Sequence, residues 1–93
     1  MPRPIVRFVK DPDARLDYQI DWSLWLAEDD EIAAHDIVEV DGVEVDASSH
    51  DANTVTLVVS GGEAGVAAQA TCRVTTAAGW VDDRTVAWRI RQR

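Results

Sequence analysis

The side chains of this 93-residue chain that are best suited to chemistry are two histidines, one cysteine and many carboxylates. A catalytic nucleophile needs a base within hydrogen-bonding distance and usually a third group that orients this base. His35 precedes Asp36 and His50 precedes Asp51 in polar sequence, and no serine lies in a Gly-x-Ser-x-Gly turn. We therefore expect exposed surface histidines and predict that the protein is not an enzyme.

Metal and cofactor sites are not predicted either. Two histidines and Cys72 are too few for an ordinary four-ligand zinc site, so we expect Cys72 to be a small buried hydrophobe. Acidic residues cluster at three loop-like positions, but no segment has the twelve-residue pattern of a calcium-binding loop. These clusters are Asp11 with Asp13, Asp29 to Glu31, and Asp82 with Asp83. The glycine-rich segment 61–65 lacks the lysine of a phosphate-binding loop.

The clearest structural signal is a turn followed by a strand. Asp11, Pro12 and Asp13 break regular structure, because proline fixes φ and the aspartates bond to nearby backbone. Apolar and polar residues then alternate strictly, with Leu16, Tyr18, Ile20 and Trp22 on one side and Asp17, Gln19 and Asp21 on the other. This period of two predicts a strand of an antiparallel sheet, with one face on a core and the other in water.

Similar patterns along the rest of the chain predict about seven short strands. They cover residues 4–9, 15–22, 32–40, 43–46, 54–60, 67–76 and 84–91. Asp41 and Gly42 predict a tight hairpin between the third and fourth strands, and residues 48–53 are expected to form a polar loop. The spacing of the turns predicts a single all-β domain over residues 1–93, an immunoglobulin-like antiparallel β-sandwich.

The charges are distributed unevenly. The net charge is −8, and all 17 acidic residues lie between Asp11 and Asp83, where only Arg15 and Arg73 offset them. The remaining bases lie near the ends of the chain: Arg3, Arg7, Lys10, Arg84, Arg89, Arg91 and Arg93. The acidic bulk argues against nucleic acid as a partner, and no apolar run reaches the roughly 18 residues of a membrane span. If the terminal strands lie together, they form a basic patch suited to protein docking. The alternative is that the charges only keep the protein soluble and the basic ends have no docking role.

The four tryptophans differ in their expected roles. Trp22 and Trp88 are in phase with apolar neighbours and are predicted to lie in the core, whereas Trp25 is expected in the core or at its edge. Trp80 follows Gly79 at a turn, where it either caps the core or contacts a partner. Exposed aromatic residues beside charges are typical of interface hot spots.

Several short motifs follow one another in a fixed order. They are Lys10–Asp13, Leu16–Tyr18, Asp21–Ser23, Trp25–Leu26, Ser60–Gly62 with Gly65, Thr75–Thr76, Gly79 and Asp82–Arg84. In this order they resemble the phage fibre–tail adaptor family, over about Lys10 to Ile90. The resemblance implies a virion structural protein without catalytic residues, a β-sandwich that links parts of the tail or neck. The chain departs from the family at Trp80, where members usually carry arginine, and at Trp88, where they carry a smaller aliphatic residue.

The leading hypothesis is a tail or neck adaptor of a phage or prophage that is made in the host bacterial cytoplasm and present in the virion in many copies around a symmetry axis. Ring assembly requires one face to meet a different face of the neighbouring copy, and basic terminal strands against acidic loops would serve. Its partners are therefore expected to be other virion proteins, with no nucleic acid, membrane, cofactor or metal.

The candidate residues fall into two groups. Those predicted to bind a partner are Trp80, Arg89, Arg91, Arg93, Glu28, Asp29, Asp30 and Glu31. Those predicted to serve the fold are Asp11, Pro12, Asp13, Tyr18, Trp22, Trp25, Asp82, Asp83 and Arg84. Within the last three, we expect an aspartate to satisfy turn amides and the arginine to pair with a carboxylate.

Two alternatives stay open at this point. A host-surface or carbohydrate-binding module would need at least two exposed tryptophans on one surface. A chaperone of assembly would be absent from mature particles.

Overall fold

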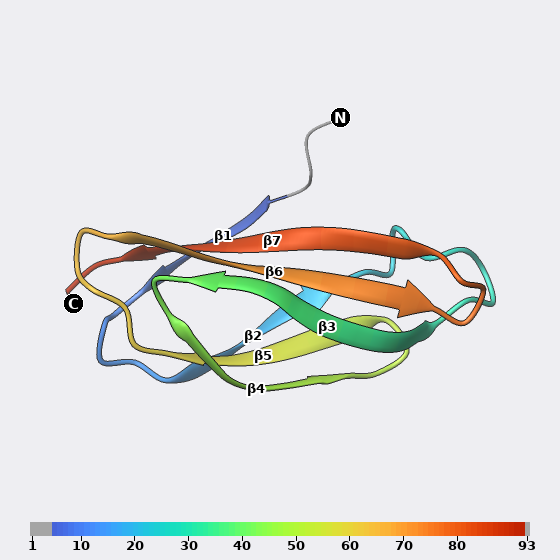
Figure 1. The fold of residues 1–93 in the computed structure, drawn as a ribbon, viewed down its shortest axis with the longest axis horizontal. Helices are drawn as coiled ribbons and strands as arrows, with labels where there is room; N and C mark the ends of the chain where they lie inside the picture. The colour runs from blue at the N-terminus through green and yellow to red at the C-terminus, as the bar shows by residue number, and fades with distance from the viewer. Residues whose placement is uncertain (1–4, 93) are drawn as a thin grey trace.

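Residues 5–92 form seven strands that pack as two sheets in the computed structural model (Figure 1). The strands are β1 (Ile5–Lys10), β2 (Leu16–Asp21), β3 (Ile32–Asp41), β4 (Glu44–His50), β5 (Thr54–Ser60), β6 (Ala67–Thr76) and β7 (Val81–Ile90). One sheet has the order β1-β7-β6-β3 and the other the order β2-β5-β4. Apart from β1, which joins the sheet of β7 rather than that of β2, this division of strands is that of an immunoglobulin-like sandwich and confirms the predicted all-β class.

The two terminal strands lie side by side. β1 pairs with β7 in parallel, with Val6 opposite Val86 and Lys10 opposite Ile90, whereas the other four ladders are antiparallel as predicted. A parallel pair needs a long connection between its strands, and here nearly the whole chain provides it. The condition for a basic patch at the terminal strands is therefore met.

The core lies between the two sheets and follows the predicted alternation. Its buried residues include Ile20, Trp22, Val55, Leu57, Val59, Ala70, Cys72, Val74, Val86, Trp88 and Ile90. The ring of Tyr18 lies 4.8 Å from that of Phe8 and 5.5 Å from that of Trp88, centroid to centroid, so aromatic contacts join β1, β2 and β7. Leu16 was predicted to share this face but is 53% exposed, because it begins its strand at the edge of the core.

The buried thiol matches its prediction. Cys72 lies on β6 with no accessible surface, and burial raises the pKa of its thiol to about 11. The thiol therefore stays protonated and serves as a small hydrophobe.

The predicted hairpin at Asp41 and Gly42 is wrong in its pairing. Gly42 has the positive φ, 80°, that a tight turn requires. However, β3 pairs with β6 and β4 pairs with β5, so this turn carries the chain from one sheet to the other. The predicted loop at 48–53 is also partly wrong, because β4 continues to His50.

The segment Asp82–Arg84 is strand rather than turn, so its predicted role is corrected. Asp83 accepts hydrogen bonds from Arg73 on β6 at 2.8 and 3.1 Å. Arg84 donates to the backbone oxygen of Asp21, and its guanidinium lies 4.3 Å from the centroid of the Trp22 ring. Arg84 thus links the two sheets through a carbonyl and an aromatic face.

The turn at Asp11 forms as predicted. The backbone N–H of Asp13 donates to Oδ1 of Asp11 at 2.8 Å, and the N–H of Ala14 donates to the Asp11 carbonyl at 3.1 Å. This turn connects β1 in one sheet to β2 in the other.

Candidate functional site

The predicted partner-binding residues lie at two separate places on the molecule. Trp80 directly precedes β7, whereas Arg89 lies near its end and Arg91 follows it. At about 3.3 Å per residue, the ten residues of β7 span roughly 30 Å, which is most of the 42 Å length of the molecule. The two ends of β7 are also the two ends of the sandwich (Figure 1).

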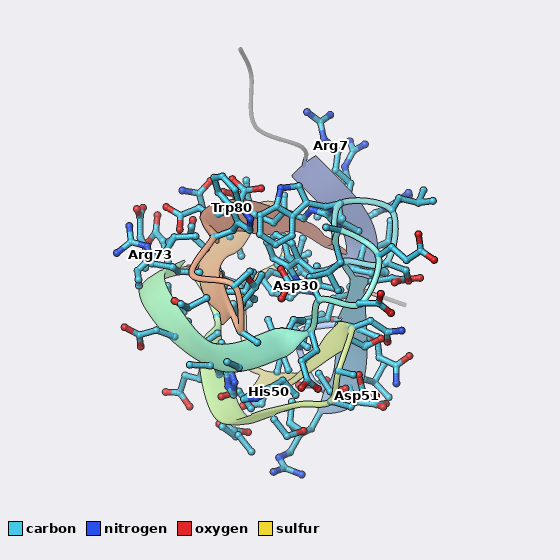
Figure 2. All side chains as sticks on the ribbon, turned by 90° about the vertical axis from the view of Figure 1, so that its right-hand side faces the viewer. Arg7, Asp30, His50, Asp51, Arg73 and Trp80 are labelled. Carbon is cyan, nitrogen blue, oxygen red and sulfur yellow. The ribbon has the colours of Figure 1, made fainter. Side chains whose placement is uncertain are left out.

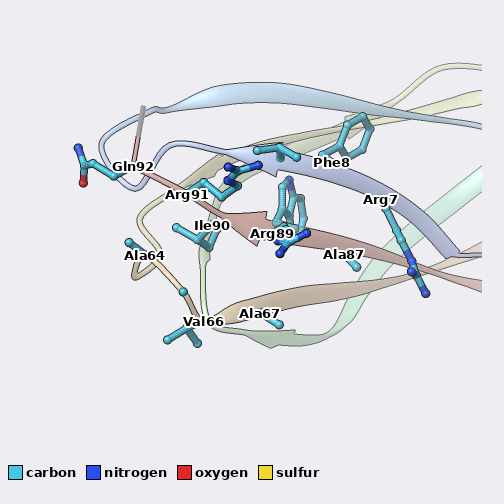
Figure 3. Close-up of a pocket in the computed structure, with 13 residues that line it drawn as sticks. Arg7, Phe8, Ala64, Val66, Ala67, Ala87, Arg89, Ile90, Arg91 and Gln92 are labelled. Carbon is cyan, nitrogen blue, oxygen red and sulfur yellow. The ribbon is translucent and has the colours of Figure 1, made fainter.

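The first place is a hollow beside Arg7, Arg89 and Arg91, which we call the arginine groove (Figure 3). Its volume is about 860 Å³, and its lining comes from β1, the end of β7 and the segment 64–67. The small side chains of Ala67 and Ala87 leave space between the longer ones. Arg7 was not among the predicted site residues, although its place in the first strand was the available signal.

The three arginines of this groove differ from the other described bases. Nζ of Lys10 is buried and donates to the carbonyl oxygens of Asp11 and Gly61 at 2.8 and 2.6 Å, so the predicted basic patch loses this residue. Arg15 pairs with Asp46 at 2.9 Å. Arg73 and Arg84 are held by the contacts described above.

By contrast, Arg7, Arg89 and Arg91 are exposed and bond to no other side chain among residues 5–92. Arg93 lies outside the described residues.

The second place, the tryptophan end, consists of Trp80, the β2–β3 loop (residues 22–31) and the β6–β7 turn (residues 77–80). The backbone of Trp80 bonds twice to Thr76, and its side chain is 66% exposed (Figure 2). A hollow of about 370 Å³ lies between Trp80 and the half-buried Trp25, whose ring packs edge-on against Trp22. This exposure favours a contact role for Trp80 over a cap on the core, and the role stays a prediction.

The acidic run of this end contains one residue with a structural role. Oδ1 of Asp30 accepts hydrogen bonds from the backbone N–H groups of Glu31, at 2.9 Å, and Ala78, at 3.1 Å. Burial by itself raises the pKa of Asp30, but hydrogen bonds from Thr76, Glu31 and Ala78 bring it below its usual value. Asp30 therefore ties the β2–β3 loop to the β6–β7 turn, whereas Glu28, Asp29 and Glu31 are exposed.

The two histidines come together, which the sequence did not predict. Nδ1 of His35 on β3 faces Nδ1 of His50 on β4, and Nε2 of His35 contacts Oγ of Ser48 at 2.9 Å. Burial lowers the pKa of His35, and His50 lowers it further while Asp36 opposes the shift. These contacts connect the edge strands of the two sheets at an exposed position.

Neither a metal site nor a membrane-spanning helix is found among residues 5–92. In this range no group of three or more histidine, cysteine or acidic side chains is arranged to hold a metal ion. The same residues contain no helix with the length and apolar character of a membrane span.

Comparison with known families identifies a match to most of the chain. The model of a family described as "Podophage GP4 fiber-tail adaptor protein gp77" matches residues 10–89, which include β2 to β6 and nearly all of β7. None of the curated proteins matches the chain.

Proposed function

The chain belongs to the podophage GP4 fiber-tail adaptor family, and on this premise we propose that it links fibres to the tail or neck by protein–protein docking. The family membership confirms the resemblance of the ordered motifs and gives the chain a structural role in a phage tail. The match over residues 10–89 is the observation that carries the proposal. Docking requires no catalytic residue and no cofactor.

The surface of the molecule supports a role with two partners. An adaptor must hold two neighbours at once, and the arginine groove and the tryptophan end lie at opposite ends of the sandwich. One surface offers arginines and the other offers an exposed aromatic ring with carboxylates, so each suits a different partner surface. Arg89, Arg91 and Arg93 would serve the first contact, and Trp80 with Glu28, Asp29 and Glu31 the second.

We further propose that the protein is made in the cytoplasm of the host and is present in the virion in several copies around a symmetry axis. The unlike surfaces at the two ends support this, because a closed ring needs contacts between different faces. The acidic bulk of the chain makes nucleic acid an unfavourable partner.

Quantitative peptide mass spectrometry of purified particles tests the proposal. The expected result is recovery of the chain at a fixed ratio to the major tail protein, and this ratio would indicate the symmetry. Absence from intact particles would overturn the proposal and leave an assembly factor.

A carbohydrate-binding module is the second candidate, and one observation favours it: Trp25 and Trp80 line the same hollow. Against it, the ring of Trp25 packs on Trp22 and is half-buried. Of the two tryptophans that line the hollow, Trp80 is therefore the one with an exposed ring, whereas the module needs two. A glycan array with the wild-type protein and Trp80→Ala decides between the candidates. Binding that is lost in Trp80→Ala supports the carbohydrate module, and no binding supports docking.

A further inference from the structure

The three arginines of the groove, whose side chains bond to no other side chain among residues 5–92, form a row along the end of β7. Arg7 is level with Ala87 across the β1–β7 pair, Arg89 follows two residues further, and Arg91 continues the ladder by donating its N–H to the Lys10 carbonyl. At about 3.3 Å per residue, successive levels of this row are about 7 Å apart. Like charges in one row repel each other, so a carboxylate ligand between them would be favourable.

The arginine groove also offers apolar surface. Val9 and Val66 at its borders are 46% and 44% exposed, Ala87 lies beside Arg7, and Ala67 lies opposite Arg89 on β6. Apolar surface with charged residues around it is the composition of a protein interface. A free anion would use the arginines alone, whereas a protein segment would cover the valines as well.

The tryptophan end carries the complementary groups. Trp80 and Val81 are 66% and 57% exposed, Leu24 is fully exposed, and Glu28 and Asp29 lie in the same loop as Leu24. Arginine pairs with carboxylates through its planar fork and also stacks on tryptophan. The length of β7 separates the two surfaces, so one copy cannot bring its own arginines to its own Trp80.

We propose that the arginine groove of one copy binds the tryptophan end of a second copy, which joins copies head to tail. This inference rests on the proposed function, in which several copies share one symmetric assembly. A contact between unlike faces closes into a ring when the rotation between copies permits it and otherwise extends as a chain.

Two half-blocked variants test this contact. R89E/R91E removes the groove and keeps the tryptophan end, whereas E28Q/D29N/W80A removes the tryptophan end and keeps the groove. R15E/R73E is the matched control, because it makes the same charge change as R89E/R91E outside the groove, at the Arg15–Asp46 and Arg73–Asp83 ion pairs. Circular dichroism establishes that each variant is folded, and R89Q/R91Q replaces R89E/R91E if charge reversal prevents folding.

The oligomeric state of each protein is measured by sedimentation velocity at low ionic strength. Wild-type protein and R15E/R73E are expected to form oligomers that grow with concentration, whereas each half-blocked variant alone stays monomeric. An equimolar mixture of the two variants is expected to form dimers that grow no further, because it contains one intact groove and one intact tryptophan end per pair.

Two results would overturn the inference. Dimers of either half-blocked variant alone would indicate a contact between like faces. Wild-type protein that stays monomeric at every concentration would exclude a second copy as the occupant, even if the chain is recovered from particles and the proposed function stands. If R89E/R91E is then missing from particles, the occupant of the groove is a different virion protein.

Discussion

The two ends of the sandwich hold their exposed side chains in different ways. At the arginine groove, Arg7 and Arg89 project from paired strands, and the ladder of β1 with β7 sets their spacing. At the tryptophan end, Trp80 projects from a turn that is tied to a neighbouring loop through the carboxylate of Asp30. A strand face is fixed by many backbone bonds, whereas a loop contact depends on a few, so a single change can release the tryptophan end without disturbing the groove.

The largest expected effect distinguishes the two tryptophans at the ends of β7. Trp88 is buried and contacts Tyr18, so Trp88→Ala should lower the free energy of unfolding by about 3–5 kcal/mol. Trp80 is exposed, so Trp80→Ala should change it by less than about 0.5 kcal/mol. Urea denaturation measures both values. An equal cost for the two variants would show that Trp80 caps the core, contrary to its assignment as a contact residue.

A smaller effect is expected at Asp30. Asp30→Ala removes the acceptor for the N–H groups of Glu31 and Ala78 and should lower the free energy of unfolding by less than Trp88→Ala does. Amide hydrogen exchange should become faster at Ala78 but not at Arg89. Asp30→Asn keeps an oxygen acceptor and should recover part of the loss. Faster exchange at both Ala78 and Arg89 would contradict the expectation that the tryptophan end can loosen without disturbing the arginine groove.

The smallest effect is expected at the histidine pair, which belongs to neither end. The pKa of His35 lies below its unfolded value of about 6.5, so the unfolded chain takes up the proton first as the pH falls. The folded state therefore favours the neutral form of His35. The contribution of this neutral form to the free energy of unfolding is complete above about pH 6.5 and is lost as the pH falls below it. The melting temperature should therefore fall between about pH 6.5 and 5, before most carboxylates titrate. His35→Gln should remove much of this slope, and an unchanged slope would contradict the assignment.

The strand faces could be predicted because alternation is a local property. The inward residues of β5 and of the second half of β7 were identified correctly, since Val55, Leu57, Val86 and Trp88 are buried. The sheet to which each strand belongs could not be predicted from alternation. The sequence of β3 and β4 is typical of a hairpin at Asp41, yet these strands pair with β6 and β5, which lie further along the chain.

The candidate site shows the same limit. The sequence placed bases at both chain ends, but the partner of each base is a long-range neighbour. Lys10 meets Gly61, 51 residues away, and Arg84 meets Asp21, 63 residues away. Only the pairing of β1 with β7 shows that Arg7, rather than Lys10 or Arg84, belongs with Arg89.

Incorporation of variants into particles shows whether the chain is a virion adaptor that docks through its exposed ends. Phage carrying R89E/R91E would be compared with phage carrying R15E/R73E, with the copy number per tail measured by quantitative mass spectrometry. We expect wild-type incorporation of R15E/R73E and a loss of about tenfold or more for R89E/R91E. Equal incorporation of the two variants would contradict it.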